Sequence, residues 1–244
     1  MNKIESAQNA HFKKLLSLTS AKGLKAEGLF LLGGEKLVRE FLQKPHLTIA
    51  YEIVPAGGKP LTRSDGIKII ELAENLFAEI DVLGTHYNIL AVEQPTIGKL
   101  ADAKTHRPKG IEVVIPIGDP GNLGALIRSC EAFSVPRVIL AREAAHPFLP
   151  KAVKASAGSV LRVPMLRGPA LADFPASSIA LDMGGQSIYK FKWPKDGMLI
   201  VGEEGSGLGR AKFTQRVTIP TQGVESLNAV VAASIALAHM ATLT

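Results

Sequence analysis

The sequence predicts an α/β protein in two parts, a small α/β domain followed by a domain built on a parallel sheet. Short runs of Val, Ile and Leu alternate along the chain with segments whose apolar residues have helical spacing. In the second half these runs are apolar throughout, which is typical of parallel strands covered on both faces. A chain of 244 residues, 46% of them hydrophobic, is long enough to bury such cores.

The first part alternates strands and helices. Asn9, a favoured helix cap, precedes Phe12, Leu15 and Leu16 at helical spacing, and Gly33-Gly34 ends an apolar run. We expect helices over residues 9–18, 35–42 and 71–80, and strands over 29–32, 48–54, 67–70 and 88–92.

A polar connector separates the two parts. Residues 96–110 include Lys99, Lys104, Arg107 and Lys109, and this stretch could hold a short helix around residues 97–103. We therefore expect one domain over residues 1–95, a linker over 96–110 and a second domain over 111–244.

The second part repeats the strand-and-helix alternation over a longer stretch. We expect strands over residues 112–117, 137–141, 177–182, 198–201 and 217–220, and helices over 123–133, 151–157 and 226–240. In such sheets ligands bind beyond the carboxyl ends of the strands. That rule directs attention to the loops 118–122, 202–209 and 220–226.

Composition excludes several classes of protein. One cysteine, Cys130, rules out an intramolecular disulfide framework and a cysteine-cluster zinc site, and we expect no metal. We find no apolar run of about 18 residues and no apolar leader, so we expect a cytoplasmic protein without a membrane span. The formal net charge is +6, most of it carried after residue 106, which is compatible with nucleic acid but shared by many enzymes.

The first loop combines a turn with a helix start. Asp119-Pro120-Gly121-Asn122 has turn chemistry followed by a cap, and Arg128 lies further along the helix, within reach of the strand ends. A tight turn plus a surface arginine is the simpler interpretation of this loop taken alone.

The second loop, residues 202–209, holds four glycines, which allow a backbone to approach a ligand closely. It lacks the glycine pattern of dinucleotide-binding folds and the Gly-Lys-Ser/Thr of phosphate loops. Glu203 and Glu204 would repel phosphate, so the loop suits a cationic or hydroxyl-bearing ligand, or it is simply a flexible turn.

The third loop leads into a long apolar helix. Ser226 is a natural N-cap, and Asn228 in the first turn could present its amide to a ligand. An ordinary capped core helix is the alternative.

Taken together, the three loops resemble a known family. Asn122…Arg128, Gly202-x-Glu204-Gly205 and Ser226-Leu227-Asn228 are similar, in order and spacing, to the three signature motifs of the SpoU/TrmH group of SPOUT RNA ribose 2′-O-methyltransferases. Residues 1–95 resemble the ribosomal-protein-like substrate-binding domain that precedes the catalytic domain in many members, through residues 30–34 and 88–92.

The resemblance implies a deep trefoil knot in the C-terminal domain, S-adenosylmethionine bound at that knot, and a homodimer formed through the same domain. It implies two sets of site residues. Those around the cofactor are Met183, Gly184, Gly202, Ile219 and Leu227. Those in catalysis are Arg128, Asn122, Glu204, Ser226 and Asn228.

The implied chemistry is methyl transfer from a sulfonium to a ribose hydroxyl, with 23S ribosomal RNA as the expected substrate. A guanidinium keeps its proton at neutral pH, so we expect Arg128 to stabilise the developing alkoxide or grip the adjacent phosphate, while a phosphate oxygen or water shares in removing the proton. Glu204 would orient Arg128 or the ribose, while Asn122 and Asn228 fix loop and substrate geometry.

Seven basic residues are candidates for contacts with RNA, although each taken singly could be a solvated charge. They are Lys13, Lys14, Lys22, Lys25, Arg142, Lys151 and Lys154. A low aromatic content, 5%, argues against a base-stacking platform of the single-strand-binder type. The alternatives are a transfer RNA 2′-O-methyltransferase, a resistance enzyme with the same chemistry, and an RNA-binding or ribosome-assembly protein without turnover.

Overall fold

The protein folds into two compact units in a computed structural model that describes residues 2–62, 66–203 and 207–243. The first unit comprises Met1–Thr96 together with His146–Gly158, and the second comprises Ile97–Ala145 together with Ser159–Thr244. The chain therefore passes from the first unit to the second near the predicted boundary. It also returns residues 146–158 to the first unit, which the sequence did not indicate. The functions of the predicted domains stay a prediction.

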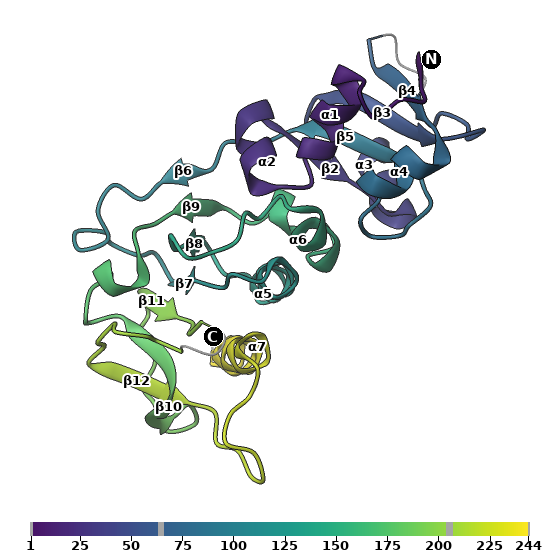
Figure 1. Cartoon of the computed structure of the whole chain (residues 1–244). Coiled ribbons are helices and arrows are strands. Elements are labelled where there is room, and N and C mark those ends of the chain that lie inside the picture. Colours follow the sequence, from purple (N-terminus) through teal and green to yellow (C-terminus); the bar gives the residue numbers. More distant parts are fainter. Residues whose placement is uncertain (1, 63–65, 204–206, 244) are drawn as a thin grey trace. The chain divides into compact units, whose positions relative to one another are not determined.

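The first unit is a mixed five-stranded sheet with helices around it (Figure 1). In sheet order its strands are β1 (Asn2–Ile4), β4 (Lys68–Leu72), β3 (Ile49–Pro55), β5 (Ile89–Glu93) and β2 (Leu29–Leu32). Its helices are α1 (Ala10–Ser17), α2 (Ala21–Glu27), α3 (Glu35–Gln43), α4 (Glu74–Ile80) and α6 (Pro150–Ala155). β1, β4 and β3 are parallel, whereas β5 is antiparallel to β3 and β2.

Local capping explains where the first helices begin. The side chain of Asn9 accepts hydrogen bonds from the backbone N–H groups of His11 and Phe12, which confirms the predicted start of α1. α2 and β1 were missed. α2 starts at the cap Ser20 and ends at Gly28, which has a φ of 64°. α4 begins at Glu74, three residues later than predicted, because Glu71 and Leu72 belong to β4.

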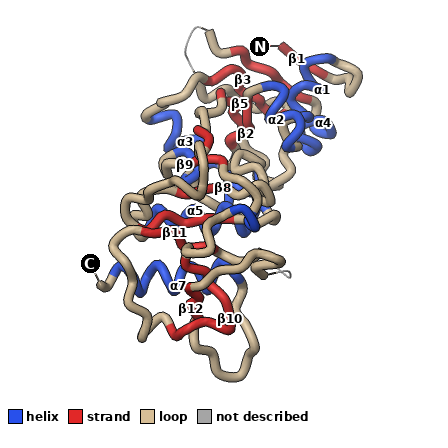
Figure 2. Tube along the Cα trace, turned by 90° about the vertical axis from the view of Figure 1, so that its left-hand side faces the viewer, coloured by secondary structure: helices blue, strands red, loops and turns tan. Residues whose placement is uncertain are grey.

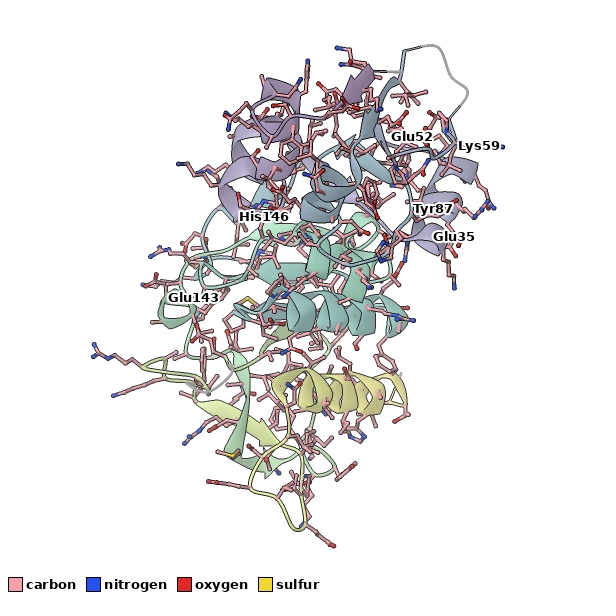
Figure 3. The ribbon with its side chains drawn as sticks, turned by 45° about the vertical axis from the view of Figure 1, so that its right-hand side comes forward. Glu35, Glu52, Lys59, Tyr87, Glu143 and His146 are labelled. Atoms are coloured by element: carbon pink, nitrogen blue, oxygen red, sulfur yellow. The ribbon has the colours of Figure 1, made fainter. Side chains whose placement is uncertain are left out.

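A buried carboxylate on this sheet binds residues 61 and 62. Glu52 is fully buried on β3, and Figure 3 labels it near Lys59. Its oxygens accept hydrogen bonds from the N–H of Leu61 (2.6 Å), from the N–H and hydroxyl of Thr62 (2.9 and 2.5 Å) and from the amide of Asn88 (2.6 Å). A buried charge with this many donors is stabilised instead of costly, so Leu61 and Thr62 are held against β3.

Residues 146–158, which follow strands of the second unit in sequence, complete the core of the first unit. Phe148 is fully buried and stacks on Phe30 of β2, with ring centroids 5.1 Å apart. α6 begins directly after it, and Lys154 donates a hydrogen bond to the carbonyl of Leu83 at 3.3 Å. Residues far along the chain therefore supply packing that β2 needs.

The second unit contains a seven-stranded sheet in which every pair of neighbouring strands is parallel, as predicted. In sheet order its strands are β12 (Gln215–Thr218), β10 (Ile179–Ser187), β11 (Gly197–Ile200), β7 (Ile111–Ile115), β8 (Val138–Leu140), β9 (Met165–Arg167) and β6 (Gly98–Lys99). β10 and β12 run side by side (Figure 1, Figure 2). Because all the strands are parallel, all their carboxyl ends lie at one edge.

Helices and short turns cover the two faces of this sheet. α5 (Pro120–Ala132) and α7 (Ala229–Ala241) pack together (Figure 1). The hydroxyls of Ser129 and Ser234, one on each helix, are 2.7 Å apart. Two short 3₁₀ helices also belong to the unit, Ser159–Leu161 and Leu171–Asp173. Leu171, Phe174 and Phe213 form a core with the apolar residues of the central strands.

The linker prediction was partly wrong. Residues 97–103 hold no helix, because β6 forms there and pairs with β9. β6 and β9 are very short strands without an apolar run of their own. The deep trefoil knot concerns the threading of the chain and stays a prediction. Within the described residues, no helix is both long and apolar enough to cross a membrane.

Candidate active site

A pocket of about 640 Å³ opens at the carboxyl ends of β10, β11 and β12. Residues 181–183 line one wall, 201–203 and 207–208 another, and 218–221 and 225–229 the third, with Ala232 beneath. Two of the three predicted loops therefore meet around one cavity. Its volume is within the range of about 300–1,000 Å³ typical of small-molecule sites.

The glycine-rich loop forms a tight backbone bridge at the pocket. The N–H of Glu203 donates to the carbonyl of Gly207 at 2.6 Å, and the N–H of Gly207 donates to the carbonyl of Glu203 at 3.0 Å. A Cβ on Gly202 would lie 3.2 Å from the backbone of Gly207, so glycine allows the two segments to approach this closely. Glu204 lies outside the described residues.

The start of α7 and the residues before it contribute to the third wall. The cap is Asn228, and Ser226 was wrongly predicted for that role. The Oδ1 of Asn228 accepts hydrogen bonds from the N–H groups of Val230 at 2.9 Å and Val231 at 3.4 Å. The helix starts at Ala229, too late for Ser226 to cap it, although Ser226 and Asn228 both line the pocket.

The charge of the pocket agrees with the preference inferred from the loop sequence. Asp182, Glu203 and Glu225 contribute carboxylates, and among the described lining residues there is neither Lys nor Arg. Arg216 donates to Asp182 at 3.0 Å. Such a pocket favours a ligand with positive charge and disfavours a polyphosphate.

The structure brings most of the proposed cofactor residues together. Met183, Gly202, Ile219 and Leu227 line the pocket. Gly184 follows Met183 but is not a lining residue. It belongs to a bulge in β10, where residues on both sides of 182–185 pair with the same residue, Val217.

The structure does not bring the first motif into the pocket. Asn122 lies in the first turn of α5, where its N–H donates to the cap Asp119 at 2.8 Å, so the helix starts earlier than predicted. Arg128 lies further along α5 with its side chain exposed to solvent. Neither residue lines the cavity of this chain.

Cys130, also on α5, is fully buried. Burial raises the pKa of its thiol to about 12. At neutral pH the thiol stays protonated, so Cys130 packs as a small hydrophobic residue and is no nucleophile.

Six of the seven candidate RNA-contacting residues belong to the first unit. Lys22 and Lys25 on α2 and Lys151 and Lys154 on α6 are exposed. Lys13 donates to Gln8 at 2.7 Å, and a hydrogen bond to Glu27 raises the pKa of Lys14. Arg142 lies in the second unit, 4.0 Å from Asp173.

The sequence reasoning missed several wall residues, among them Leu181, Thr218 and Glu225. It also did not single out the segment 189–195, in which aromatic residues and lysines alternate directly after residues that pair with the pocket residue Thr218. The signal for that segment was present in the sequence but was outweighed by the low aromatic content of the whole chain.

Known proteins share the fold and the motif region. Residues 111–238 match the family model described as the SpoU rRNA Methylase family. The chain is 36% identical, over 96% of its length, to a protein named ribosomal RNA small subunit methyltransferase G 2 from Syntrophobacter fumaroxidans, but it spans only 48% of that protein. It is 29% identical to the 23S rRNA (guanosine(2553)-2′-O)-methyltransferase RlmP of Bacillus subtilis, covering 98% of this chain and 99% of the relative.

Among solved structures, the SpoU methyltransferase AviRb from Streptomyces viridochromogenes superposes with a TM-score of 0.76 at 25% identity, covering 96% of this chain and 97% of the other. The same protein in complex with the cofactor AdoMet superposes with a TM-score of 0.79 at 23% identity, covering 97% and 98%, which is a likeness of fold.

Proposed function

The chain belongs to the SpoU rRNA methylase family, and from that premise we propose that it transfers a methyl group from S-adenosylmethionine to a ribose 2′-hydroxyl of 23S ribosomal RNA. The pocket beyond β10, β11 and β12 carries the proposal, because the second and third motifs converge there. The choice of 23S rRNA is supported by the relative RlmP, which this chain matches over nearly its whole length.

The residues of the pocket fit S-adenosylmethionine. Leu181, Ile219 and Leu227 offer apolar surface to an adenine ring, while Glu203 and Glu225 place carboxylates where a sulfonium and an ammonium gain from negative charge. Gly202, Ile219 and Leu227 would hold the cofactor, with Met183 beside its adenosine. When bound, the cofactor supplies an activated methyl group on sulfur.

The chain itself must orient the ribose and accommodate charge as the hydroxyl passes its proton to a phosphate oxygen or to water. Asn228 is fixed by its capping bonds, so its side chain is held in one position at the pocket wall. Arg128 is suited to stabilising an oxyanion or gripping the neighbouring phosphate through its planar guanidinium. We assign Glu204 to orienting Arg128 or the ribose, and Asn122 to holding the loop geometry.

A homodimer through the C-terminal domain accounts for the position of Arg128. Arg128 is exposed on α5 and does not line the cavity of its own chain. Val231 on the neighbouring α7 is 47% exposed, and the partner would cover it in such a dimer. In this proposal Arg128 of one copy completes the pocket of the other.

Mixed dimers test the position of Arg128. Arg128→Ala removes the guanidinium, and Gly202→Val disturbs the pocket through the backbone of Gly207. Each variant alone should lose about 100-fold or more in kcat. A mixture of the two should regain activity, because an intact pocket then meets an intact Arg128 from the other copy. A mixture that stays inactive would place Arg128 at the pocket of its own chain.

The Arg128→Lys variant tests whether the reaction needs the paired hydrogen bonds of the planar guanidinium. Lysine keeps the charge but cannot make the paired hydrogen bonds of arginine. We expect Arg128→Lys to recover little of the activity that Arg128→Ala loses, with unchanged S-adenosylmethionine affinity by calorimetry. Near-normal turnover in Arg128→Lys would show that charge alone suffices.

We propose that the first unit selects the RNA, using exposed lysines on α2 and α6. The near-neutral charge of the first domain means that it would recognise RNA through a local patch and shape instead of bulk attraction. A cytoplasmic location and a trefoil knot in the second unit are parts of the same proposal.

The test of the activity uses the purified chain with labelled S-adenosylmethionine and unmodified 23S rRNA, 16S rRNA and transfer RNA transcripts. We expect label in 23S rRNA at one nucleotide that resists alkaline cleavage, because a 2′-O-methyl group blocks attack on the neighbouring phosphodiester. Label in transfer RNA alone would show that transfer RNA, and not 23S rRNA, is the substrate. Failure to bind S-adenosylmethionine would instead support a protein that binds RNA without turnover.

A further inference from the structure

The connection from β10 to β11 concentrates aromatic and basic residues. Residues 189–195 read Tyr-Lys-Phe-Lys-Trp-Pro-Lys and include the single tryptophan of the chain. We call this segment the aromatic–lysine strip. Its lysines, Lys190, Lys192 and Lys195, are all exposed and form no ion pair within the described part of the chain.

The strip starts at the wall of the pocket. Ser187 pairs with Thr218 across β10 and β12, and the N–H of Ile188 donates to the carbonyl of Thr218 at 3.0 Å. Thr218 lines the pocket. Tyr189 is therefore one residue beyond a direct backbone contact with the proposed cofactor site.

The rings of the strip are held in position. Tyr189 is 64% exposed, and its ring makes an edge-to-face contact with His239 of α7 at 5.2 Å. Phe191 and Trp193 contact each other edge to face at 5.0 Å. The N–H groups of Lys190 and Phe191 both donate to the carbonyl of Ser187, which fixes the turn. An exposed ring that is already ordered loses little entropy when a ligand stacks on it.

We propose that the aromatic–lysine strip binds single-stranded RNA next to the target nucleotide, with a base stacked on Tyr189 and phosphates near Lys190, Lys192 and Lys195. Aromatic rings beside unpaired lysines are the chemistry that holds unstacked bases and their backbone. A second copy of the chain is the other occupant to consider, but two such strips facing each other would bring like charges together. The inference rests on the proposed RNA methyltransferase function.

Variants of Tyr189 test the stacking. Tyr189→Ala should raise the Kd for a labelled oligouridine about tenfold, and raise KM for 23S rRNA similarly with little change in kcat. Tyr189→Phe keeps the ring and should behave like the wild type. The affinity for S-adenosylmethionine, measured by calorimetry, should not change in either variant, which also confirms that both are folded.

Variants of the lysines test the phosphate contacts. Replacing Lys190, Lys192 and Lys195 together by Gln should reduce the slope of log Kd against log salt by about 2. The matched control replaces Lys99, Lys104 and Lys109, three exposed lysines of the same unit that also form no ion pair in the described chain. The control triple removes the same charge and should leave the slope unchanged.

Two results would overturn the inference while the wild type still methylates 23S rRNA. If both lysine triples reduce the salt slope equally, only the net charge of the protein affects RNA binding. If Tyr189→Ala sediments as a monomer where the wild type is a dimer, and still binds oligouridine as the wild type does, the strip is an interface between copies of the chain. Absence of methyl transfer by the wild type would count against the proposed function instead, and direct oligouridine binding would still test the strip.

Discussion

At the scale of single residues, two adjacent glycines in β10 have very different surroundings. A Cβ on Gly185 would lie 2.5 Å from the backbone carbon of Arg216 and from the backbone nitrogen of Val217. A Cβ on Gly184 would meet nothing closer than 3.7 Å. The bulge of β10 can therefore lie against β12 only if residue 185 has no side chain.

This contrast predicts that two alanine substitutions differ strongly in how much they destabilise the fold. Gly185→Ala should lower the free energy of unfolding by about 3 kcal/mol, because backbone atoms on β12 cannot move aside cheaply. Gly184→Ala should change it by less than about 0.5 kcal/mol. Urea unfolding of both variants measures the difference, and equal stabilities would mean that the bulge relaxes. Calorimetry on Gly184→Ala also tests whether this position touches the cofactor.

Cys130 predicts a pH dependence of stability. Its pKa is raised from 9.0 to about 12 by burial, so the folded state keeps a proton that the unfolded state loses above pH 9. Its contribution is fully present below pH 9 and is lost as the pH rises towards 12. The gap in unfolding free energy between wild type and Cys130→Ala should shift by roughly 1.4 kcal/mol at pH 10, relative to pH 7. A constant gap across this range would show that the thiol ionises in the folded state.

At the scale of elements, the start of α7 serves both the fold and the site. Asn228 caps the helix and lines the pocket at the same time. A carboxylate in place of its amide can still accept the two capping bonds, and it gains from the positive end of the helix.

Substitutions at Asn228 can therefore separate capping from ligand contact. Asn228→Ala should cost about 1 kcal/mol of stability and also lose activity. Asn228→Asp should keep the stability but lose methyl transfer, because the amide donor is gone. Ser226→Ala, the matched control at the position first predicted to cap, should leave stability unchanged. Loss of stability in Ser226→Ala would contradict the assignment of the cap to Asn228. Urea unfolding and methyl-transfer assays provide the two measurements.

The sequence predicted elements best where an apolar run or a cap marks them locally. β2, β7 and α1 were found close to their true limits. β6 and β9 were missed because these strands of two and three residues lack an apolar run like that of β8 and are defined by their neighbours.

The residues of the candidate site also divide into those that the sequence could place and those that it could not. The second and third motifs each follow a strand of one parallel sheet, so their meeting at one edge followed from topology. The position of Arg128 relative to the pocket could not be predicted in this way. The sequence pattern places Arg128 on a helix, but it does not show which cavity an exposed side chain on that helix reaches. The capping error at Ser226 has a local cause, since both Ser226 and Asn228 are good caps and the final turn of the loop decides between them.

At the scale of the whole molecule, the division into two units does not follow the order of the chain. Residues 146–158 lie in sequence between strands of the second unit, yet they pack in the first. The stability of the first unit therefore depends on a segment encoded within the motif-bearing half. Phe148 is central to this dependence, because it is fully buried against Phe30 of β2.

Two matched Phe→Ala variants test this dependence. Phe148→Ala removes a buried ring and should destabilise the first unit by about 3 kcal/mol or more. Hydrogen exchange of the β2 amides should then accelerate, although β2 lies more than a hundred residues earlier in the sequence. Phe174→Ala removes another buried ring, from the core of the second unit, and should accelerate exchange there while β2 stays protected. If Phe148→Ala instead exposed only the strands of the second unit, residues 146–158 would belong with the half of the chain in which they are encoded.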